Sequence, residues 1–393
     1  MAVPTKQVVV WWNGRSERMK IPENYSPDLE DQRHRGNETP ADDFHVIGKG
    51  AQAGVIGAIL TYPTGDRRVA AKRYVMADLR GEKSYRWLMR ELQNTQYLVH
   101  PNIVQHMETF FEVGPDDNVK YTWIVTERME LTLLEHFTRV NHPDRVERQR
   151  KHGKVAALMT QIFMALDFLH NRGVMHRDLN PKNIAMDRDL NIKLLDFGCS
   201  GLTNSDGEHT GHDGVGTPLF YRPPELLLPD VRYDARVDVW AVGLIALEML
   251  GMPPFSANGF TGGSPNEYYR WALKEMIKVL GLPDHRHETV FGKHFCRDAP
   301  CASRLMETIA VPLGRLDVDT MLNKEKLESL LSDIFNMDPM GRPTARQCLE
   351  TPYLKGYHVR YKQIHAVRQN ANAEETDRRD VRILLEGFAK KLQ

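Results

Sequence analysis

The sequence has few cysteines and no excess of charge of either sign. Among its 393 residues it has four cysteines, without the close pairing of metal sites or redox motifs: Cys199, Cys296, Cys301 and Cys348. Such sparse cysteines predict free thiols in a reducing compartment. Lysine plus arginine and aspartate plus glutamate number 52 each, so the net charge is zero. No overall field therefore favours a nucleic acid or a membrane surface as a partner.

Long apolar runs and targeting signals are also missing. No apolar stretch reaches the length of about 20 residues that a membrane-spanning helix needs. The first residues, MAVPTKQ, do not form a charged region followed by an apolar one, and Ala2 stands where myristoylation requires glycine. The final KKLQ lacks the cysteine of a prenylation signal. We therefore expect an intracellular protein, in the cytoplasm, the nucleus or both.

What the sequence does contain is a change of pattern along its length. Short β-rich runs separated by turn residues come first, with one helix among them, and helical periodicity follows. The expected strands are 44–47, 55–60, 68–72 and 121–126, and the expected helices are 85–97, 154–169, 237–249, 271–280 and 326–335. The pattern predicts an N-terminal extension (1–42), a domain in two parts (43–130 and 131–354) and a C-terminal tail (355–393).

Two apolar runs lie in the terminal segments, and each has two interpretations. Residues 8–12 predict a short strand that packs on the main body, or a docking segment for a partner. Residues 381–388 predict an amphipathic helix that folds back on the larger part, or a helix that binds a partner.

The most informative motifs are HRDLNPKN at 176–183 and DFG at 196–198. They place a carboxylate (Asp178), a carboxamide (Asn183) and a second carboxylate (Asp196) at short, fixed spacings. Phosphoryl transfer depends mainly on positioning and charge neutralisation: one group orients the acceptor hydroxyl and others hold Mg²⁺ on the phosphates. We assign the first task to Asp178 and the second to Asn183 and Asp196. Either motif alone could arise by chance, but both in this order rarely do.

With five further motifs in the same order, these runs resemble the eukaryotic protein kinase family over residues 44–354. The resemblance implies an α+β, two-lobed fold. A small, β-rich N-lobe (43–130) carries one main helix, and a larger C-lobe (131–354) is mainly helical. It also implies a serine/threonine protein kinase that uses ATP and Mg²⁺, with Asp178 accepting the proton of the substrate hydroxyl.

The resemblance names the residues of the nucleotide site. GKGAQAGV at 48–55 resembles the glycine-rich loop, VAAK at 69–72 the strand with the phosphate-binding lysine, and VTERM at 125–129 the hinge. The implied nucleotide-binding residues are Gly48, Lys49, Gly50, Val55, Ala70, Lys72, Glu127 and Met129. The implied catalytic residues are Lys72, its ion-pair partner Glu91, Asp178, Asn183 and Asp196. The last two would hold the metal.

Residues 216–225, GTPLFYRPPE, resemble the substrate-facing loop of serine/threonine kinases. There the hydroxyl of Thr217 would contact the catalytic aspartate. Arg222 and the LGLP segment at 280–283 resemble the CMGC group, which contains cyclin-dependent and MAP kinases. The Thr-x-Tyr pair of MAP kinases is absent, and His212 replaces the phosphorylated threonine of cyclin-dependent kinases. The chain therefore resembles a divergent member of that group.

The resemblance also implies contacts that support the fold and control activity. Glu225 would pair with Arg342, and Asp238 would anchor the catalytic loop. Arg177, beside Asp178, implies control by a phosphate on the loop between residues 196 and 225. Its candidate hydroxyls are Thr203, Ser205, Thr210 and Thr217, with Thr210 preferred.

Several residues depart from the family pattern, and Asn180, Thr95 and Ala185 bear most on activity. Asn180 stands where serine/threonine kinases have a lysine that reaches the transferred phosphate. Loss of that cation predicts slower turnover, by roughly 2–4 kcal/mol in the barrier. Thr95 and Ala185 replace larger apolar residues and should loosen the packing on which nucleotide affinity depends.

These departures leave alternatives to an active protein kinase. One is a pseudokinase scaffold that binds partners with little or no phosphotransfer. Another is a kinase-like enzyme for a small molecule, which the complete peptide-docking loop at 216–225 disfavours. We expect protein substrates, a possible regulatory partner through the N- or C-terminal tail, and no nucleic-acid or membrane partner.

Overall fold

The structure, a computed structural model, forms two compact units. It describes residues 5–12, 15–22, 46–49, 53–62, 65–79, 82–113, 119–139, 152–203, 216–227, 232–250, 265–280 and 321–373. The N-terminal unit comprises Met1–Val99 and Val104–Glu130, and the C-terminal unit comprises His100–Ile103 and Leu131–Gln393.

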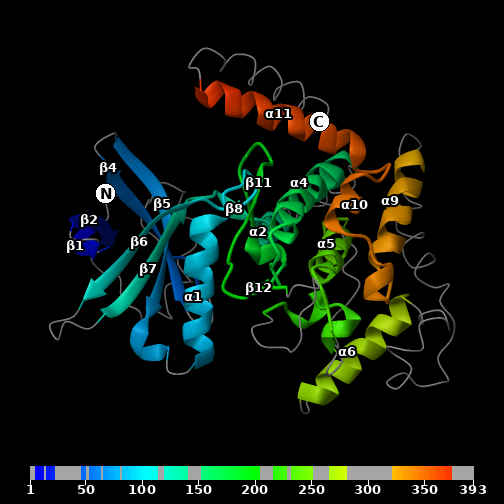
Figure 1. The fold of residues 1–393 in the computed structure, drawn as a ribbon, viewed down its shortest axis with the longest axis horizontal. Helices are drawn as coiled ribbons and strands as arrows, with labels where there is room; N and C mark the ends of the chain where they lie inside the picture. Colours follow the sequence, from blue (N-terminus) through cyan, green and yellow to red (C-terminus); the bar gives the residue numbers. More distant parts are fainter. Residues whose placement is uncertain are drawn as a thin grey trace. The chain divides into compact units, whose positions relative to one another are not determined.

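The N-terminal unit is an antiparallel sheet with one long helix, α1 (Glu82–Tyr97), beside it (Figure 1). The strands lie in the order β2-β1-β6-β7-β5-β4-β3. Their bounds are β1 (Thr5–Trp12), β2 (Arg15–Pro22), β3 (Val46–Lys49), β4 (Ala53–Tyr62), β5 (Gly65–Val75), β6 (His106–Val113) and β7 (Val119–Glu127). A 3₁₀ turn, η2 (Met76–Asp78), follows β5.

The alternation of side chains along β5 produces two separate cores. Val69 and Ala71 belong to a cluster of buried residues with Ile56, Ala58, Phe110, Trp123 and Val125. Tyr74 points to the other face and packs with Leu88 of α1, in a cluster completed by Ala53, Leu79 and Ile124. The sheet is therefore covered on both faces, which explains the apolar character of its central strands.

The hairpin β1–β2 links β6 at one end of this sheet to β4, the strand next to β3. Trp11 in β1 pairs with Phe111 in β6, and Met19 in β2 pairs with Leu60 in β4. These pairings close β2, β1, β6, β7, β5 and β4 into a ring. The predicted strand at 8–12 is therefore present, as one arm of a hairpin. Among the described strands, β3 pairs with β4 alone and therefore remains at an edge of the sheet.

The C-terminal unit is mainly helical. Its helices are α2 (Leu133–Arg139), α4 (His152–His170), α5 (Arg236–Met249), α6 (Pro265–Leu280), α9 (Met321–Ile334), α10 (Ala345–Leu349) and α11 (Lys355–Ala373). Short strands, β8 (Leu131–Thr132), β9 (Val174–Met175), β10 (Ile184–Met186), β11 (Ile192–Leu194) and β12 (Gly201–Leu202), lie between them. The 3₁₀ turns are η3 (Pro181–Asn183), η4 (Leu219–Tyr221), η5 (Pro224–Leu227) and η8 (Pro339–Gly341).

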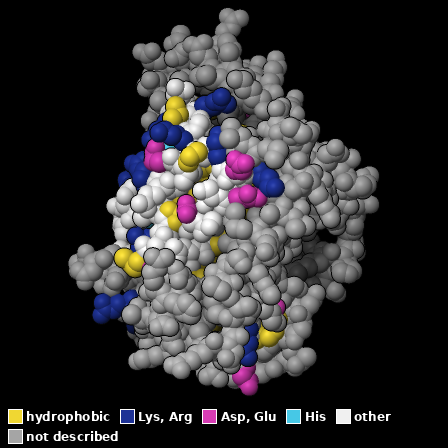
Figure 2. Space-filling view, turned by 90° about the vertical axis from the view of Figure 1, so that its right-hand side faces the viewer, with side chains coloured by type: hydrophobic (Ala, Val, Ile, Leu, Met, Phe, Trp, Pro, Cys, Tyr) yellow, Lys and Arg dark blue, Asp and Glu magenta, His cyan; other side chains and the backbone are white. Residues whose placement is uncertain are grey.

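Helices α1, α4, α5, α6 and α9 lie where the sequence predicts helices. α5 is apolar around its whole circumference and is almost entirely buried, as such a helix must be. No helix in the described part of the chain is long and apolar enough to cross a membrane. On the face in Figure 2, the visible basic and acidic side chains are interspersed, in agreement with the zero net charge.

α11 lies in the segment that the sequence predicts to be a polar tail. Its residues Tyr361 and Ile364 are each 5% exposed, and the Tyr361 hydroxyl accepts a hydrogen bond of 2.7 Å from Gln161 Nε2 on α4. Figure 1 shows α11 beside α4. The expected helix at 381–388 lies outside the described residues.

Candidate active site

In the N-terminal unit, Lys72 of β5 and Glu91 of α1 form an ion pair. The Lys72 ammonium lies 2.9 Å from Glu91 Oε1 and 2.8 Å from Oε2. Glu91 is 5% exposed as a residue, whereas the Lys72 side chain keeps 16% of its surface exposed. The ion pair that the family resemblance implies is therefore formed, and its cation remains partly accessible.

The other predicted nucleotide contacts of this unit lie on β3, β4, β5 and β7. Gly48 pairs with Val55 and Lys49 with Gly54 in the β3–β4 hairpin, while Ala70 pairs with Thr126. Gly50 lies outside the described residues.

The hinge segment follows directly from β7. The Glu127 amide donates to the Gln105 carbonyl at 3.0 Å, and the Gln105 amide donates to Glu127 Oε1 at 2.7 Å. Met129 is half-buried just after the strand. The Glu127 amide is therefore already used within the protein.

In the C-terminal unit, Asp238 of α5 holds the loop that carries Asp178. Its carboxylate accepts the backbone amides of His176 (2.8 Å) and Arg177 (2.9 Å), and the His170 ring nitrogen Nε2 lies 2.9 Å away. Arg177 has a φ of 59°, a left-handed conformation that costs free energy for a non-glycine residue. The two bonds to Asp238 offset that cost and fix the turn.

The pKa values of His176 and Asp238 are both lowered, but by different causes. For His176 burial is the main cause, and its pKa lies below 6.5. Burial alone would raise the pKa of Asp238. His170, His176 and the Arg177 amide outweigh it, and the pKa is lowered. A neutral histidine and an ionised aspartate are therefore the forms that this site favours.

Two carboxamides bind the Asp178 carboxylate. Asn180 Nδ2 lies 3.0 Å from Asp178 Oδ1, and Asn183 Nδ2 lies 2.9 Å from Oδ2. Both amides also donate to the Asp178 carbonyl. The Asn180 Oδ1 accepts the Lys182 amide, which caps η3. Asn180, the departure from the family lysine, is thus a buried part of the site with its amide turned to Asp178.

The segment after β11 places Asp196 beside a buried aromatic pair. Asp196 has a φ of 60°, and its Oδ1 accepts the Gly198 amide at 3.2 Å. Phe197 is fully buried, with its ring centroid 5.1 Å from that of His176. The left-handed turn at Asp196 thus separates a buried ring from a half-buried carboxylate.

Gly216 begins the predicted substrate loop in close contact with this segment. A Cβ at this position would lie 2.2 Å from Cys199 Sγ and 3.2 Å from Asp178 Cγ. The resemblance implies a contact between the Thr217 hydroxyl and Asp178. The hydroxyl donates instead to the carbonyl of Arg177, the residue before Asp178. Only glycine permits the loop to pass so near Asp178.

Arg177, the predicted phosphate-responsive arginine, and Arg222 of the substrate loop both form hydrogen bonds within the protein. The Nε, Nη1 and Nη2 atoms of Arg177 donate to Cys199 O, Tyr233 Oη and Ser200 O at 2.9–3.1 Å, and the residue is 1% exposed. Arg222 Nε donates to Thr217 O at 2.6 Å and Nη1 to the Tyr269 hydroxyl at 3.2 Å. A phosphate that binds Arg177 would therefore have to displace these acceptors. Thr210 lies outside the described residues.

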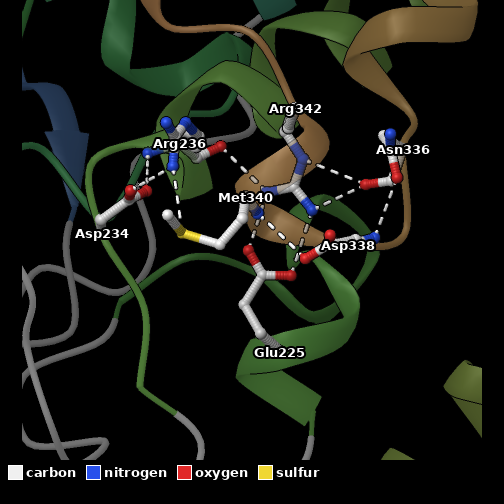
Figure 3. A network of polar contacts seen from close by, with 7 residues as sticks. All are labelled: Glu225, Asp234, Arg236, Asn336, Asp338, Met340 and Arg342. Atoms are coloured by element: carbon white, nitrogen blue, oxygen red, sulfur yellow. Dashed lines mark hydrogen bonds and ion pairs between the residues drawn. The ribbon is translucent and has the colours of Figure 1, made fainter. Parts of the chain in front are cut away.

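Glu225, the last residue of the substrate loop, forms a buried ion pair with Arg342 (Figure 3). Arg342 Nη1 and Nη2 donate to the two oxygens of Glu225 at 2.7 and 3.1 Å, and neither side chain is exposed. Arg342 also donates to the carbonyls of Asn336 and Arg236. This pair, predicted from the sequence as structural, fastens η5 to the segment before α10.

Two features of the site escape prediction from the sequence. The Tyr74 hydroxyl donates to Glu91, and the Thr95 hydroxyl donates to the Glu91 carbonyl within α1. The alternation of β5 puts Tyr74 on the same face as Lys72, but the reach of its hydroxyl to α1 depends on packing. Thr95, expected to loosen this packing, satisfies its hydroxyl inside the helix.

Comparison with known sequences identifies the fold family. The model of the protein kinase domain matches residues 42–354. The chain belongs to the protein kinase family. The kinase is 29% identical over 316 residues to a cyclin-dependent kinase 4 homolog of Caenorhabditis elegans, covering 79% of this chain and 70% of that protein.

MAP kinases are similar to the same degree. The mitogen-activated protein kinase pmk-1 of C. elegans is 28% identical over 325 residues, which cover 79% of this chain and 75% of that protein. Mitogen-activated protein kinase 4 of Mus musculus is 31% identical over 326 residues, 80% of this chain and 50% of that protein. The kinase therefore resembles the CMGC group, as the sequence predicts, and has the two-lobed α+β fold of its family.

The oxygen donors near Asp178 fit a magnesium ion that also binds substrate phosphates better than a metal ion held by protein side chains alone. The described residues contain no group of three or more His, Cys, Asp or Glu side chains that could hold a metal by themselves. Magnesium uses one or two carboxylates together with substrate phosphates and water. Asn183 directs its amide nitrogen to Asp178, which does not occupy its carboxamide oxygen. This oxygen and the Asp196 carboxylate are oxygen ligands of the type that magnesium prefers.

Proposed function

We propose that the kinase is an active serine/threonine protein kinase that transfers the γ-phosphate of ATP to hydroxyls of protein substrates. The observation that carries the proposal is the state of Asp178. Two carboxamides orient its carboxylate, yet the residue is only half-buried. A carboxylate fixed in direction and open to solvent suits a group that must orient an incoming hydroxyl and accept its proton.

Each unit would contribute a different part of the chemistry. Lys72, held by Glu91, would bind the α- and β-phosphates, and Asn183 with Asp196 would bind Mg²⁺. The metal would neutralise charge that develops on the phosphoryl group. Gly48, Lys49, Gly50, Val55 and Ala70 would enclose the nucleotide. Because the Glu127 amide is used by Gln105, adenine would meet the carbonyl of Glu127 and the backbone of Met129.

The choice of acceptor rests on the loop that starts at Gly216. Its Gly-Thr start and its contact with Asp178 support serine and threonine as the acceptor residues. Tyr221 in this loop donates to Glu248 of α5, and burial together with that bond raises the pKa of the phenol. A loop anchored in this way would present a peptide rather than a small molecule.

The proposal also covers the regulation of the kinase and its cellular compartment. A phosphate on Thr210 would act by taking the place of the acceptors now bound to Arg177. A regulatory partner would bind through one of the tails. Sparse cysteines without motif spacing support a reducing compartment, the cytoplasm or the nucleus.

Transfer of labelled phosphate tests the proposal directly. Purified kinase is incubated with Mg²⁺, labelled ATP and a generic basic protein, beside Asp178→Asn as the matched control. We expect label on serine and threonine in the first sample and a loss of at least about 100-fold in the control. Nucleotide binding with equal, background transfer in both samples would overturn the proposal and favour the pseudokinase scaffold that Asn180, Thr95 and Ala185 motivate.

A further inference from the structure

Tyr74 lies between the sheet and α1, two residues after Lys72 on β5. Because side chains alternate along a strand, Lys72 and Tyr74 share the face that meets α1. The tyrosine is 2% exposed, and its ring packs with Leu88 of α1, also 2% exposed, and with Leu92. The ring therefore belongs to the apolar contact that holds the helix on the sheet.

The Tyr74 hydroxyl adds a polar contact at the same place. It donates to Glu91 Oε2, the oxygen that also lies 2.8 Å from the Lys72 ammonium. The ammonium in turn lies 5.3 Å from the centroid of the Tyr74 ring. Two neighbouring residues of one strand thus bind the same carboxylate of the facing helix.

This arrangement matters because Glu91 is buried. A carboxylate removed from water is costly unless donors compensate it, and a bond from a hydroxyl to a charged oxygen is among the stronger ones. Rotation of α1 away from β5 would break the bonds from Lys72 and Tyr74 together. A phenylalanine or an aliphatic residue at position 74 would leave Glu91 with one fewer donor.

We infer that Tyr74 is a positioning residue that holds Glu91, and with it α1, against β5, so that Lys72 stays in place for the phosphates. Its consequence for catalysis rests on the proposed function. The positioning itself does not, since it concerns contacts within the N-terminal unit.

Hydrogen exchange of the α1 amides tests the positioning without any need for catalysis. The proteins are the full-length kinase, Tyr74→Phe, Glu91→Ala and the double variant. Tyr121→Phe is the matched control, because it removes a tyrosine hydroxyl from β7 but keeps the ring that lies 4.5 Å from Arg73. We expect Tyr74→Phe to speed exchange in α1 about tenfold, the size of effect expected for one lost charge-assisted bond. Tyr121→Phe should leave it unchanged.

The double variant separates positioning from a general loss of packing. If Tyr74 acts through Glu91, then Tyr74→Phe adds nothing once Glu91→Ala has removed the acceptor. An unchanged exchange rate in Tyr74→Phe, or a full additional effect in the double variant, would overturn the inference.

Phosphate transfer provides the second measurement. We expect Tyr74→Phe to lower kcat/KM for ATP about tenfold, again with no further loss in the Glu91→Ala background. If the unmodified kinase transfers no phosphate while α1 still responds to Tyr74→Phe, the proposed function fails and the positioning stands. If transfer is normal and equal in both proteins, the positioning role in catalysis fails and the proposed function stands.

Discussion

The two ion pairs described above use the same chemistry in different ways. Arg342 and Glu225 in the C-terminal unit are both fully buried, and the guanidinium also binds two backbone carbonyls and lies 4.8 Å from the Trp240 ring. In the N-terminal unit the distances between Lys72 and Glu91 are just as short, but the lysine side chain keeps 16% of its surface exposed.

The difference shows how the exposure of a cation decides whether it stabilises the fold or can bind a ligand. An arginine has five donors in a rigid fork, and the surroundings of Arg342 use them within the fold. A lysine has three donors around one ammonium group, and the exposed part of Lys72 can still meet a ligand. The closed pair should therefore matter most for stability and the accessible pair most for activity.

Breaking the closed pair should have the largest effect. Arg342→Ala leaves the Glu225 carboxylate buried without its cation, so we expect the C-terminal unit to lose about 3–5 kcal/mol in its free energy of unfolding. Denaturant unfolding followed by circular dichroism measures it. In the double variant Arg342→Met/Glu225→Leu, which leaves no charge behind, the loss should be smaller. A loss below about 1 kcal/mol in Arg342→Ala would contradict the comparison.

Breaking the accessible pair should affect activity more than stability. We expect Lys72→Met to reduce phosphate transfer about 100- to 1000-fold, because the proposed function assigns to this cation the binding of the phosphates. The free energy of unfolding should change by less than about 2 kcal/mol, since Tyr74 still donates to Glu91. Labelled-ATP assays and denaturant titration of the same samples give both values. A larger stability loss than in Arg342→Ala would invert the comparison.

The amides around Asp178 sharpen the comparison in the second unit. Asn180→Lys would bring a cation to the transferred phosphate, and we expect kcat to rise about tenfold. This is less than the roughly 2–4 kcal/mol assigned to a single cation, since the Asn180 amide already supports Asp178. Steady-state kinetics measures it, with Asn180→Ala as the control that removes the amide and should lower kcat. An unchanged kcat in both Asn180→Lys and Asn180→Ala would show that this position has no part in turnover.

The motifs were predictable because their residues lie close together in the sequence. Asp178, Asn180 and Asn183 share one short loop, so their meeting follows from local spacing. The bond from Tyr74 to Glu91 links residues 17 positions apart on different elements. Its formation depends on how deeply α1 packs on the sheet, and no local pattern specifies that depth.

The same limit applies to the ends of the fold. A run of apolar residues at 8–12 predicted a strand, but the closure of the sheet by β2 depends on pairing between Met19 and Leu60, 41 residues apart. Helix α11 is mostly polar, so its sequence suggested a tail. It is stabilised by a few contacts on α4, such as that from Gln161 to Tyr361.

A second buried group of the C-terminal unit, His176, should affect the dependence of stability on pH. His176 is fully buried, and its Nε2 lies 2.9 Å from the Leu195 carbonyl. Burial lowers its pKa below 6.5, so just below pH 6.5 the unfolded chain binds a proton that the folded protein does not. This contribution to stability is therefore complete above pH 6.5 and is lost as the pH falls, by at most about 1.4 kcal/mol per pH unit.

His176→Phe removes that titration but keeps an aromatic ring next to Phe197. We expect the free energy of unfolding of the variant to fall less steeply between pH 6.5 and 5 than that of the unmodified kinase. Some slope should remain, because burial also lowers the pKa of His106, His136 and His358. Above pH 7.5 the two proteins should differ by a constant amount. Denaturant unfolding at a series of pH values measures both regimes, and parallel curves across the whole range would show that His176 titrates alike in the folded and unfolded chain.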